Sequence, residues 1–378
     1  MEKKDKSIVW KVISGVLVIA LITVSSLYYI NLKDSKNIGI SEKSISKNEN
    51  YNDNRNDTKN ALSLWTDSSK LKAELTLYMN TITDNNSKDF IPVKNRIAVF
   101  DMDGTLCCET DPGYFDHKLL YHRVMEDADY KDKASEEEKE TAEIIKKYFE
   151  TGEYPKGLDV KHGKAVATAF KGMTLAEFDN YVKKYASESM QGYNNLTNKQ
   201  AFYKPMLEVI DYLQANDFKV YIVSGTDRLI TRGLAEGVVN IPLSQMIGSD
   251  ESLVATNQGE KDGLDYTFKK DDKVITGGEF LIKNLKMNKV TVIEQEIGEQ
   301  PVLCFGNSSG DEAMANFTIN NNKYKSGAYM LCCDDITREN GNVEKANKMY
   351  ESCKKNGYTA ISMKNDWKTI YGESVTRK

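Results

Sequence analysis

The stretch IAVFDMDGTL, residues 97–106, joins an apolar run to two aspartates, a glycine and a threonine. Its first four residues are all apolar, which is typical of a strand covered on both faces in a parallel sheet. Asp101 and Asp103 follow where such a strand emerges at its carboxyl end. Open α/β sheets bind their ligands at this edge. The stretch therefore predicts both the type of fold and the position of the functional site.

Later apolar runs repeat the pattern of a buried strand followed by a polar loop: residues 218–226, 301–305 and 327–335. Segments with apolar residues at helical spacing lie between these runs, and residues 205–217 are one example. Strands that alternate with helices and end in glycine-containing loops are typical of a doubly wound sheet. The sequence therefore predicts an α/β protein with a parallel, Rossmann-like sheet, built from residues 61–106 and 203–378.

Two segments interrupt this alternation. Residues 248–285 look like β-hairpin segments, whereas residues 107–202 carry mostly helical patterns directly after the first strand and its turn. A helical domain inserted there would cover the carboxyl end of that strand, so we expect a cap over the site. Tyr114, Phe115 and Tyr121 lie near the start of the cap. These aromatic side chains either pack between cap and core or cradle a quaternary ammonium ion.

The first part of the chain is expected to attach the protein to a membrane. Residues 12–30 are uncharged and close in length to the ~20 residues with which a helix crosses a bilayer. Lysines precede this run, which favours a cytoplasmic tail at 1–7, a transmembrane signal anchor at 8–30 and a polar linker at 31–60. The rest of this single-pass protein then lies outside the cell membrane. A cleaved signal peptide, which would give a secreted protein, and a buried soluble helix are the alternatives.

Charge and cysteine usage exclude several classes of protein. The formal net charge is −5, and lysines and acids are interspersed without a basic stripe, so no nucleic acid is expected as a partner. The six cysteines include adjacent pairs at 107–108 and 332–333 and lack the spacing of a metal site or a disulfide framework. We expect buried free thiols, although an exported location permits disulfides. The three histidines have no obvious nucleophile to pair with and are expected to be surface or packing residues of the cap.

Three strand ends carry polar groups that converge if the strands are neighbours. The first offers Asp101 and Asp103, the second Ser224 and Gly225, and the third the loop GNSSGD at residues 306–311. Hydroxyl, carboxylate and amide groups at one edge of a sheet can hold an anion and a cation together. We therefore expect Ser224 and Gly225 to bind the substrate.

A basic segment precedes the third of these strands. Lys289 is expected to open a helix, with Asn288 as its N-cap and Gly298 as its C-terminal stop. The ammonium group of Lys289 would then add positive charge beside a bound phosphate. Lys283 and Lys286 lie close enough in the sequence to compete for this role.

These residue types suit phosphoryl transfer. A carboxylate such as Asp101 can attack phosphorus and form an acyl phosphate, which divides one difficult displacement into two easier steps. Because a carboxylate and a phosphate repel each other, a divalent cation is needed between them, and Asp101 with Asp311 offers the oxygen ligands that Mg²⁺ prefers. Asp103 can donate a proton to the leaving alkoxide and later accept one from water. Gly104 permits a sharp backbone turn that Thr105 can hold.

The same segments resemble the four signatures of the haloacid dehalogenase-like hydrolase superfamily. VFDMDGTL, IVSGT, Lys289 and FGNSSGDEAM stand in the family's order, and the layout is similar to the phosphoserine phosphatase-like branch with a helical cap. The resemblance implies a Rossmann-like core, Mg²⁺ dependence, Asp101 as nucleophile, and Asp103 as acid/base and as metal ligand through its main-chain carbonyl. It implies roles for three further residues: phosphate binding by Ser224 and Lys289, and a place in the metal shell for Asp311.

One residue departs from the family's pattern. Many members carry an acidic residue directly after the glycine of the last signature, where this chain has Asn307. The side-chain oxygen of Asn307 can still face a cation, but it brings no charge. We therefore expect a metal site of Asp101, Asp103, Asn307 and Asp311 with weakened affinity, unless Asp311 or Glu312 ligates the metal directly.

The sequence thus predicts a membrane-tethered, Mg²⁺-dependent phosphatase that hydrolyses a small phosphorylated metabolite through an aspartyl-phosphate on Asp101. The expected cap favours a small substrate, because a lid closes around its ligand and excludes bulk water. Two alternatives stay open. One is transfer of the phosphoryl group to an alcohol instead of water, and the other is a surface binding protein that has kept the fold and lost turnover.

Overall fold

The computed structural model describes residues 62–378. The expected cytoplasmic tail, signal anchor and linker, residues 1–60, lie outside the described residues. Within residues 62–378, no helix has the combination of length and apolar character that a bilayer-spanning segment needs.

The core of the described part is a seven-stranded sheet in the order β5-β4-β3-β1-β6-β7-β8. Its strands are β1 (Ile97–Phe100), β3 (Lys219–Asp227), β4 (Met246–Ala255), β5 (Val274–Ile282), β6 (Leu303–Gly306), β7 (Gly327–Cys332) and β8 (Thr359–Ser362). All neighbours pair in parallel except β4 and β5, which form an antiparallel hairpin. The predicted α/β fold with a parallel sheet is therefore confirmed, as is the hairpin expected within residues 248–285.

Strand β1 lies at the centre of the sheet and is buried along its whole length. Phe100 at its end is in register with Ile222 of β3 on one side and Phe305 of β6 on the other. Because these strands are parallel and in register, the loops that follow them open at the same edge. The topology thus brings together the three strand ends that the sequence analysis singled out.

Two layers of helices cover the sheet, and alternate residues of β1 point into them. Phe100 packs in the apolar cluster that contains α2 (Lys70–Thr83) and α7 (Lys204–Ala215). Val99 packs in a second cluster on the opposite face of the sheet. That cluster contains the helices α9 (Met287–Glu296), α10 (Glu312–Ile319) and α11 (Val343–Asn356). Burial on both faces explains the uninterrupted apolar sequence of the strand.

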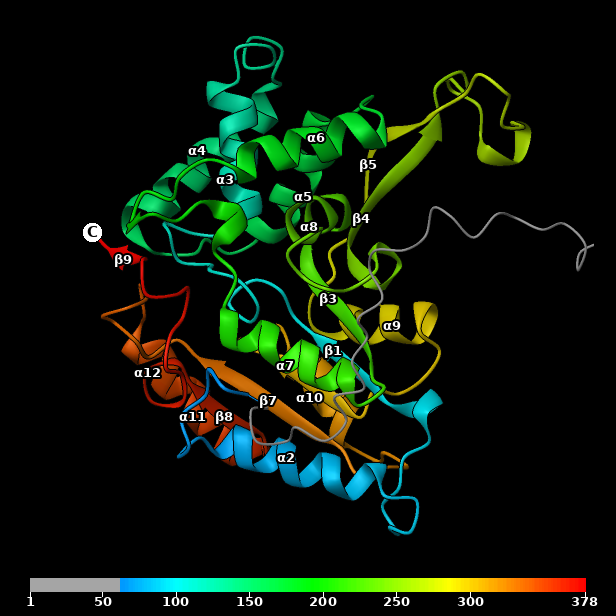
Figure 1. Cartoon of the computed structure of the whole chain (residues 1–378). Coiled ribbons are helices and arrows are strands. Elements are labelled where there is room, and N and C mark those ends of the chain that lie inside the picture. Colours follow the sequence, from blue (N-terminus) through cyan, green and yellow to red (C-terminus); the bar gives the residue numbers. More distant parts are fainter. Residues whose placement is uncertain (1–61) are drawn as a thin grey trace, which may run out of the picture. The chain divides into compact units, whose positions relative to one another are not determined.

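The segment between β1 and α7 is largely helical and lies over the carboxyl edge of the sheet (Figure 1). Its helices are α3 (Phe115–Tyr121), which continues as a π-helical turn over His122–Glu126, then α4 (Glu136–Thr151), α5 (Leu158–Ala169) and α6 (Leu175–Ala186). Ser135 and Thr174 cap the starts of α4 and α6 through reciprocal hydrogen bonds with glutamates three residues later. The chain passes from α5 to α6 at a turn that contains Gly172, whose φ is +84°.

The β4–β5 hairpin extends from the edge of the sheet and packs against the cap (Figure 1). The Thr276 hydroxyl donates to the Phe170 carbonyl at 2.5 Å, and Gly163 on α5 leaves room for the ring of Phe280. Helix α8 (Arg228–Ala235) lies between β4 and α6. The cap is therefore held by the hairpin and α8 as well as by its two connections to the core.

The last residues of the chain join the base of the cap to the core. A two-stranded antiparallel sheet pairs β2 (Tyr193–Asn194) with β9 (Thr376–Arg377), after the short helix α12 (Met363–Asp366). The fully buried carboxylate of Glu339 accepts hydrogen bonds from the hydroxyl groups of Thr110, Tyr193 and Tyr371. One side chain thus connects both ends of the cap to the C-terminal part of the core.

Candidate active site

The loop after β1 places both aspartates at the edge of the sheet. The Asp101 N–H donates to the Phe305 carbonyl at 2.9 Å, which continues the pairing of β1 with β6. The chain then turns at Gly104, whose φ is +73°, and the Gly104 N–H donates to the Cys107 carbonyl at 2.7 Å. Glycine adopts this left-handed conformation without strain. The turn leaves Asp101 and Asp103 on the wall of a cavity.

Gly104 also allows two other segments to approach closely. A Cβ atom placed on Gly104 would lie 1.9 Å from Nδ2 of Asn307 and 2.6 Å from Oε2 of Glu109. Any side chain at position 104 would therefore displace both groups. The absence of a side chain brings the loop after β6 and the start of the cap into contact with the loop that carries Asp101.

Lys289 forms a buried charge cluster with two carboxylates. Its ammonium group is fully buried and lies 2.6 Å from Oδ1 of Asp101 and 2.7 Å from Oδ1 of Asp311. Burial opposes the charge, but the Asp101 and Asp311 carboxylates raise the pKa of Lys289 above its ordinary value, so the lysine is protonated. We call these three residues the core cluster.

The other oxygen of Asp311 organises the loop after β6. Oδ2 of Asp311 accepts from the N–H groups of Asn307 at 3.1 Å and Ser308 at 3.0 Å, and from the Ser308 hydroxyl at 3.1 Å. Glu312 accepts a hydrogen bond from the Ser352 hydroxyl at 2.6 Å, away from the cavity lining. Both acids that could have replaced the missing charge at position 307 therefore have protein partners.

Asp103 lies between the core and the cap. The Thr226 hydroxyl donates to Oδ2 of Asp103 at 2.8 Å, and this bond fixes the carboxyl group at the end of β3. Burial raises the pKa of Asp103 to about 6, and the nearby carboxylate of Asp116 adds to the rise. A carboxyl group with this pKa can exchange a proton near neutral pH, as the predicted acid/base role requires.

Of the residues predicted after β3, Gly225 lines the cavity and Ser224 does not. Ser224 is fully buried, and its side-chain oxygen accepts from the Thr226 N–H at 3.0 Å. The hydroxyl group thus holds the end of the strand from within, and it is Thr226 that reaches the cavity beside Gly225. In this structure Ser224 is a supporting residue and makes no direct contact with the space available to a ligand.

The three candidate lysines divide between two positions. Lys283 and Lys286 line the cavity, whereas Lys289 lies behind Asp101 and Asp311. The expectation that Asn288 caps the helix is wrong, because α9 begins at Met287 after Lys286, which has a φ of +56°. The amide of Asn288 instead donates to the Lys283 carbonyl at 2.8 Å and so secures the loop before the helix.

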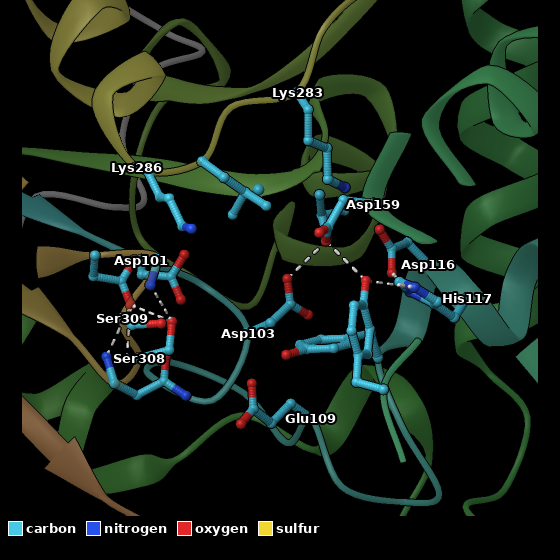
Figure 2. A pocket seen from close by; sticks show the side chains of 18 residues that line it. Asp101, Asp103, Glu109, Asp116, His117, Asp159, Lys283, Lys286, Ser308 and Ser309 are labelled. Carbon is cyan, nitrogen blue, oxygen red and sulfur yellow. Dashed lines mark hydrogen bonds and ion pairs between the residues drawn. The ribbon is translucent and has the colours of Figure 1, made fainter. Parts of the chain in front are cut away.

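The cavity has a volume of about 320 Å³ and takes its walls from both the core and the cap (Figure 2). The core supplies Asp101, Asp103, Gly225, Thr226, Lys283, Leu285, Lys286 and residues 307–311. The segment after the first loop and the cap supply Glu109, Tyr114, Asp116, His117, Tyr154 and Asp159. These last residues were not predicted as site residues, with Tyr114 left open between packing and ligand contact.

The cap wall contains a second buried polar cluster. Oδ1 of Asp116 lies 2.7 Å from Nδ1 of His117, and the ring of His117 stacks in parallel on that of His162, with centroids 4.1 Å apart. Neither ring nitrogen of His162 has a hydrogen-bond partner among residues 62–378. The expectation that the histidines are surface or packing residues is therefore wrong for His117, which lines the cavity. We call Asp116, His117 and His162 the cap cluster.

The remaining predicted residues have structural positions. Phe115 is buried in the apolar core, and Tyr121 packs against that core at the cap without lining the cavity. The six cysteines are free thiols, five buried and Cys333 partly buried. Asp227 caps α8 by accepting from the N–H groups of Leu229 and Ile230.

Two groups of donors are suited to different metals. Asp101, the main-chain carbonyl of Asp103 and Asn307 belong to loops that meet at Gly104, and their oxygen atoms are the type of ligand that Mg²⁺ prefers. Lys289 brings one positive charge against the two carboxylates of Asp101 and Asp311, and burial together with Asp311 raises the pKa of Asp101. The ligand atoms of the cap cluster lie within 4.8 Å of one another, and two imidazoles with a carboxylate suit transition metals instead.

Comparisons with known proteins identify a family. The family model of haloacid dehalogenase-like hydrolases matches residues 98–316, more than half of the chain. No curated protein matches the sequence. Similar solved structures include a protein of unknown function from Bordetella pertussis Tohama I, with 12% identity, a TM-score of 0.45 and coverage of 71% of this chain and 98% of that one. A cytosolic 5′-nucleotidase IIIB bound to cytidine has 13% identity and a TM-score of 0.47, with 81% and 91% coverage.

Proposed function

The chain belongs to the haloacid dehalogenase-like hydrolases, and from this premise we propose that it is a Mg²⁺-dependent phosphatase that hydrolyses a small phosphomonoester. One observation carries the proposal. The Asp101 carboxylate lies on the cavity wall at the end of the central strand, with a buried ammonium group 2.6 Å from one of its oxygens. This arrangement is suited to a carboxylate nucleophile that must meet an anionic substrate.

Asp101 acts as the nucleophile in the proposed mechanism. Its oxygen forms a bond to phosphorus while the bond from phosphorus to the ester oxygen breaks, which leaves an aspartyl-phosphate and an alkoxide. Lys289 holds Oδ1 of Asp101, so the carboxylate keeps one orientation throughout. Lys283 and Lys286 line the cavity and add positive charge for a bound phosphate.

Asp103 acts as the acid and then as the base. Its carboxyl group donates a proton to the leaving alkoxide and afterwards takes one from the water that attacks the aspartyl-phosphate. The hydrogen bond from Thr226 engages Oδ2, and a pKa of about 6 allows both protonation states near neutral pH. The position of Asp103 between the core and the cap supports this role, because a leaving group on the cap side of the cavity would lie near its carboxyl group.

The oxygen donors of Asp101, Asp103 and Asn307 are the residues that would hold Mg²⁺. When bound, the cation lowers the repulsion between the nucleophile and the phosphate. The cap limits the size of the substrate, because the cavity of about 320 Å³ is at the lower end of the volumes of ligand pockets, ~300–1,000 Å³. A small phosphorylated metabolite fits this space.

The experiment that tests the proposal uses the full-length chain in detergent with an aryl phosphate and a panel of phosphorylated metabolites. We expect hydrolysis that stops on chelation of Mg²⁺ and a gain of one phosphoryl group on Asp101 in acid-quenched protein, detected by mass spectrometry of the peptide. Full activity in Asp101→Asn would refute the mechanism. Added alcohols that appear as phosphorylated products would redirect the proposal toward phosphotransfer.

We also propose that the protein is anchored in the cell membrane, on the basis of the uncharged run at residues 12–30. The catalytic part then lies on the outer side of the cell membrane. Protease treatment of intact cells tests this, because residues 62–378 would be digested in such cells only if they face outward.

A further inference from the structure

The metal site expected beside Asp101 has a neutral residue, Asn307, where many members of the family have an acidic one. Asn307 contributes a neutral amide, and its Oδ1 accepts a hydrogen bond from the Thr105 hydroxyl at 3.3 Å. Asp311 is engaged by Lys289 and by its own loop, and Glu312 by Ser352. If the site binds a divalent cation, the missing charge has to come from another segment of the chain.

Glu109 lies at the required position. The contacts around Gly104 show that Nδ2 of Asn307 and Oε2 of Glu109 approach the same point, at 1.9 Å and 2.6 Å from a Cβ atom placed there. The two side chains are therefore neighbours, although they are 198 positions apart in the sequence. Figure 2 shows the Glu109 carboxylate pointing toward the side of the cavity that carries Asp101 and Ser308.

The side-chain amide of Asn307 and, from further away, Lys345 offset part of the charge of Glu109, but the carboxylate has no ion pair in the described part of the chain. Among residues 62–378, no lysine, arginine or histidine forms an ion pair with its carboxylate, although Lys345 acts on it from a greater distance. Glu109 lines the same cavity as the carboxylates of Asp101 and Asp103. A partly buried carboxylate among like charges is stabilised most directly by a cation.

We propose that Glu109 supplies the negative charge that Asn307 lacks, so that the two residues together hold the divalent cation beside Asp101. The inference rests on the proposed function only in that it needs a divalent cation at this site. It also explains why position 104 is a glycine, since a side chain there would separate the amide from the carboxylate. Two residues would thus share the role that one acidic residue has in many members of the family. Asn307 would be a neutral ligand on one loop, and Glu109 a charged ligand on another.

The test measures binding of Mn²⁺ as a probe, by electron paramagnetic resonance of the full-length chain without substrate. We expect Glu109→Gln to weaken Mn²⁺ binding by about tenfold or more, in the range for groups that support a metal site. Asn307→Asp in the Glu109→Gln background should restore the affinity to within about threefold of the wild type. Asp159→Asn, which removes an acid from the cap side of the same cavity, should leave the affinity unchanged.

A thermal unfolding scan without metal excludes a merely structural role. Removal of a carboxylate that has no ion pair should leave the Tm of metal-free Glu109→Gln equal to or above that of the wild type, while the increase in Tm on Mn²⁺ addition is lost.

The proposal is overturned if Glu109→Gln binds Mn²⁺ within twofold of the wild type. A raised KM alone would then mark Glu109 as a substrate contact. It is also overturned if Asn307→Asp gives no rescue, or if the wild type binds no Mn²⁺. Failure of the proposed function would appear separately, as Mn²⁺ binding without phosphatase activity.

Discussion

The core cluster and the cap cluster both bury charge at the same cavity, but they differ in how their groups are paired. In the core cluster, Lys289 binds Asp101 and Asp311, and the second oxygen of Asp311 accepts from its own loop. In the cap cluster, neither ring nitrogen of His162 has a hydrogen-bond partner within residues 62–378, although Nδ1 lies 3.7 Å from Oδ2 of Asp116. A buried polar group without a partner costs about 1–3 kcal/mol. The groups of the core cluster are therefore paired with one another, whereas the cap cluster keeps unpaired nitrogen atoms on His162, which stacks on His117 and does not line the cavity itself.

The largest expected effect comes from the nucleophile. Asp101→Asn should lower kcat by at least about 10³-fold, because the amide cannot form the acyl phosphate. Asp159→Asn, the matched exchange on the cap wall, should change mainly KM and by less than about tenfold. Steady-state kinetics with one aryl phosphate compare the two. Equal losses in kcat would contradict a division into a catalytic core wall and a recognising cap wall.

The next effect concerns the stability of the core cluster. Lys289→Met leaves two buried carboxylates without their cation and should lower the free energy of unfolding by about 3–5 kcal/mol in metal-free buffer. Urea unfolding followed by the fluorescence of the buried Trp65 and Trp367 measures this. Lys286→Met, at an exposed position on the same cavity, is the control and should stay within about 0.5 kcal/mol of the wild type. A loss of similar size in both variants would show that the core cluster contributes no special stability.

Asp103, between the two clusters, should show an effect that depends on the leaving group. Asp103→Asn should slow hydrolysis of an alkyl phosphate by about 10²–10⁴-fold, because the alkoxide then departs without a proton. Hydrolysis of a nitrophenyl phosphate, whose leaving group needs no proton, should slow much less. Comparison of kcat/KM for the two esters isolates this role. A uniform loss for both would contradict the role of the Asp103 carboxyl group as the acid.

The smallest effect is a pH dependence of stability from the cap cluster. Burial and the neighbouring His117 together lower the pKa of His162 to about 3, so the folded protein keeps His162 neutral where the unfolded chain protonates it. This contribution to stability is fully present above pH ~6.5 and is lost as the pH falls from there toward 3. Between pH 7.5 and 5.5 the wild type should lose about 1.4 kcal/mol that His162→Leu does not lose. Identical pH profiles of Tm would contradict a neutral, buried His162.

The residues of the core that line the cavity could largely be predicted from the sequence, because the pattern that marks them lies within short segments. Each strand end is marked in the sequence by an apolar run followed by polar residues. The end of β1, where Asp101 follows Phe100, is the clearest example. The order of the strands and the convergence of their loops follow from the rules of parallel sheets. Ser224 shows the limit of such signals, because the direction of a hydroxyl group at a strand end depends on a hydrogen bond to Thr226 that no pattern encodes.

The cap wall could not be predicted in the same way. The cap helices carry Asp116, His117 and Asp159. The spacing of apolar residues in such helices indicates which face packs against the protein, but it does not indicate which face lines the cavity. The position of Glu109 depends on its contacts with Gly104 and Asn307. Contacts between distant segments cannot be recognised from the spacing of residues in the sequence. The adjacent acid and histidine at 116–117 were the one available hint, and two neighbouring polar residues are common on helices.

The carboxylate of Glu339 has a consequence for the modularity of this protein. Its bonds to Thr110, Tyr193 and Tyr371 mean that the base of the cap is completed by residues from the far end of the chain, together with the β2–β9 pairing. A chimera that exchanged residues 107–202 for a relative's segment would replace Thr110 and Tyr193. These two residues donate two of the hydrogen bonds to the fully buried carboxylate of Glu339. A functional graft would have to carry residue 339 and the terminal strand with it, so the unit that evolution can exchange is larger than the inserted segment.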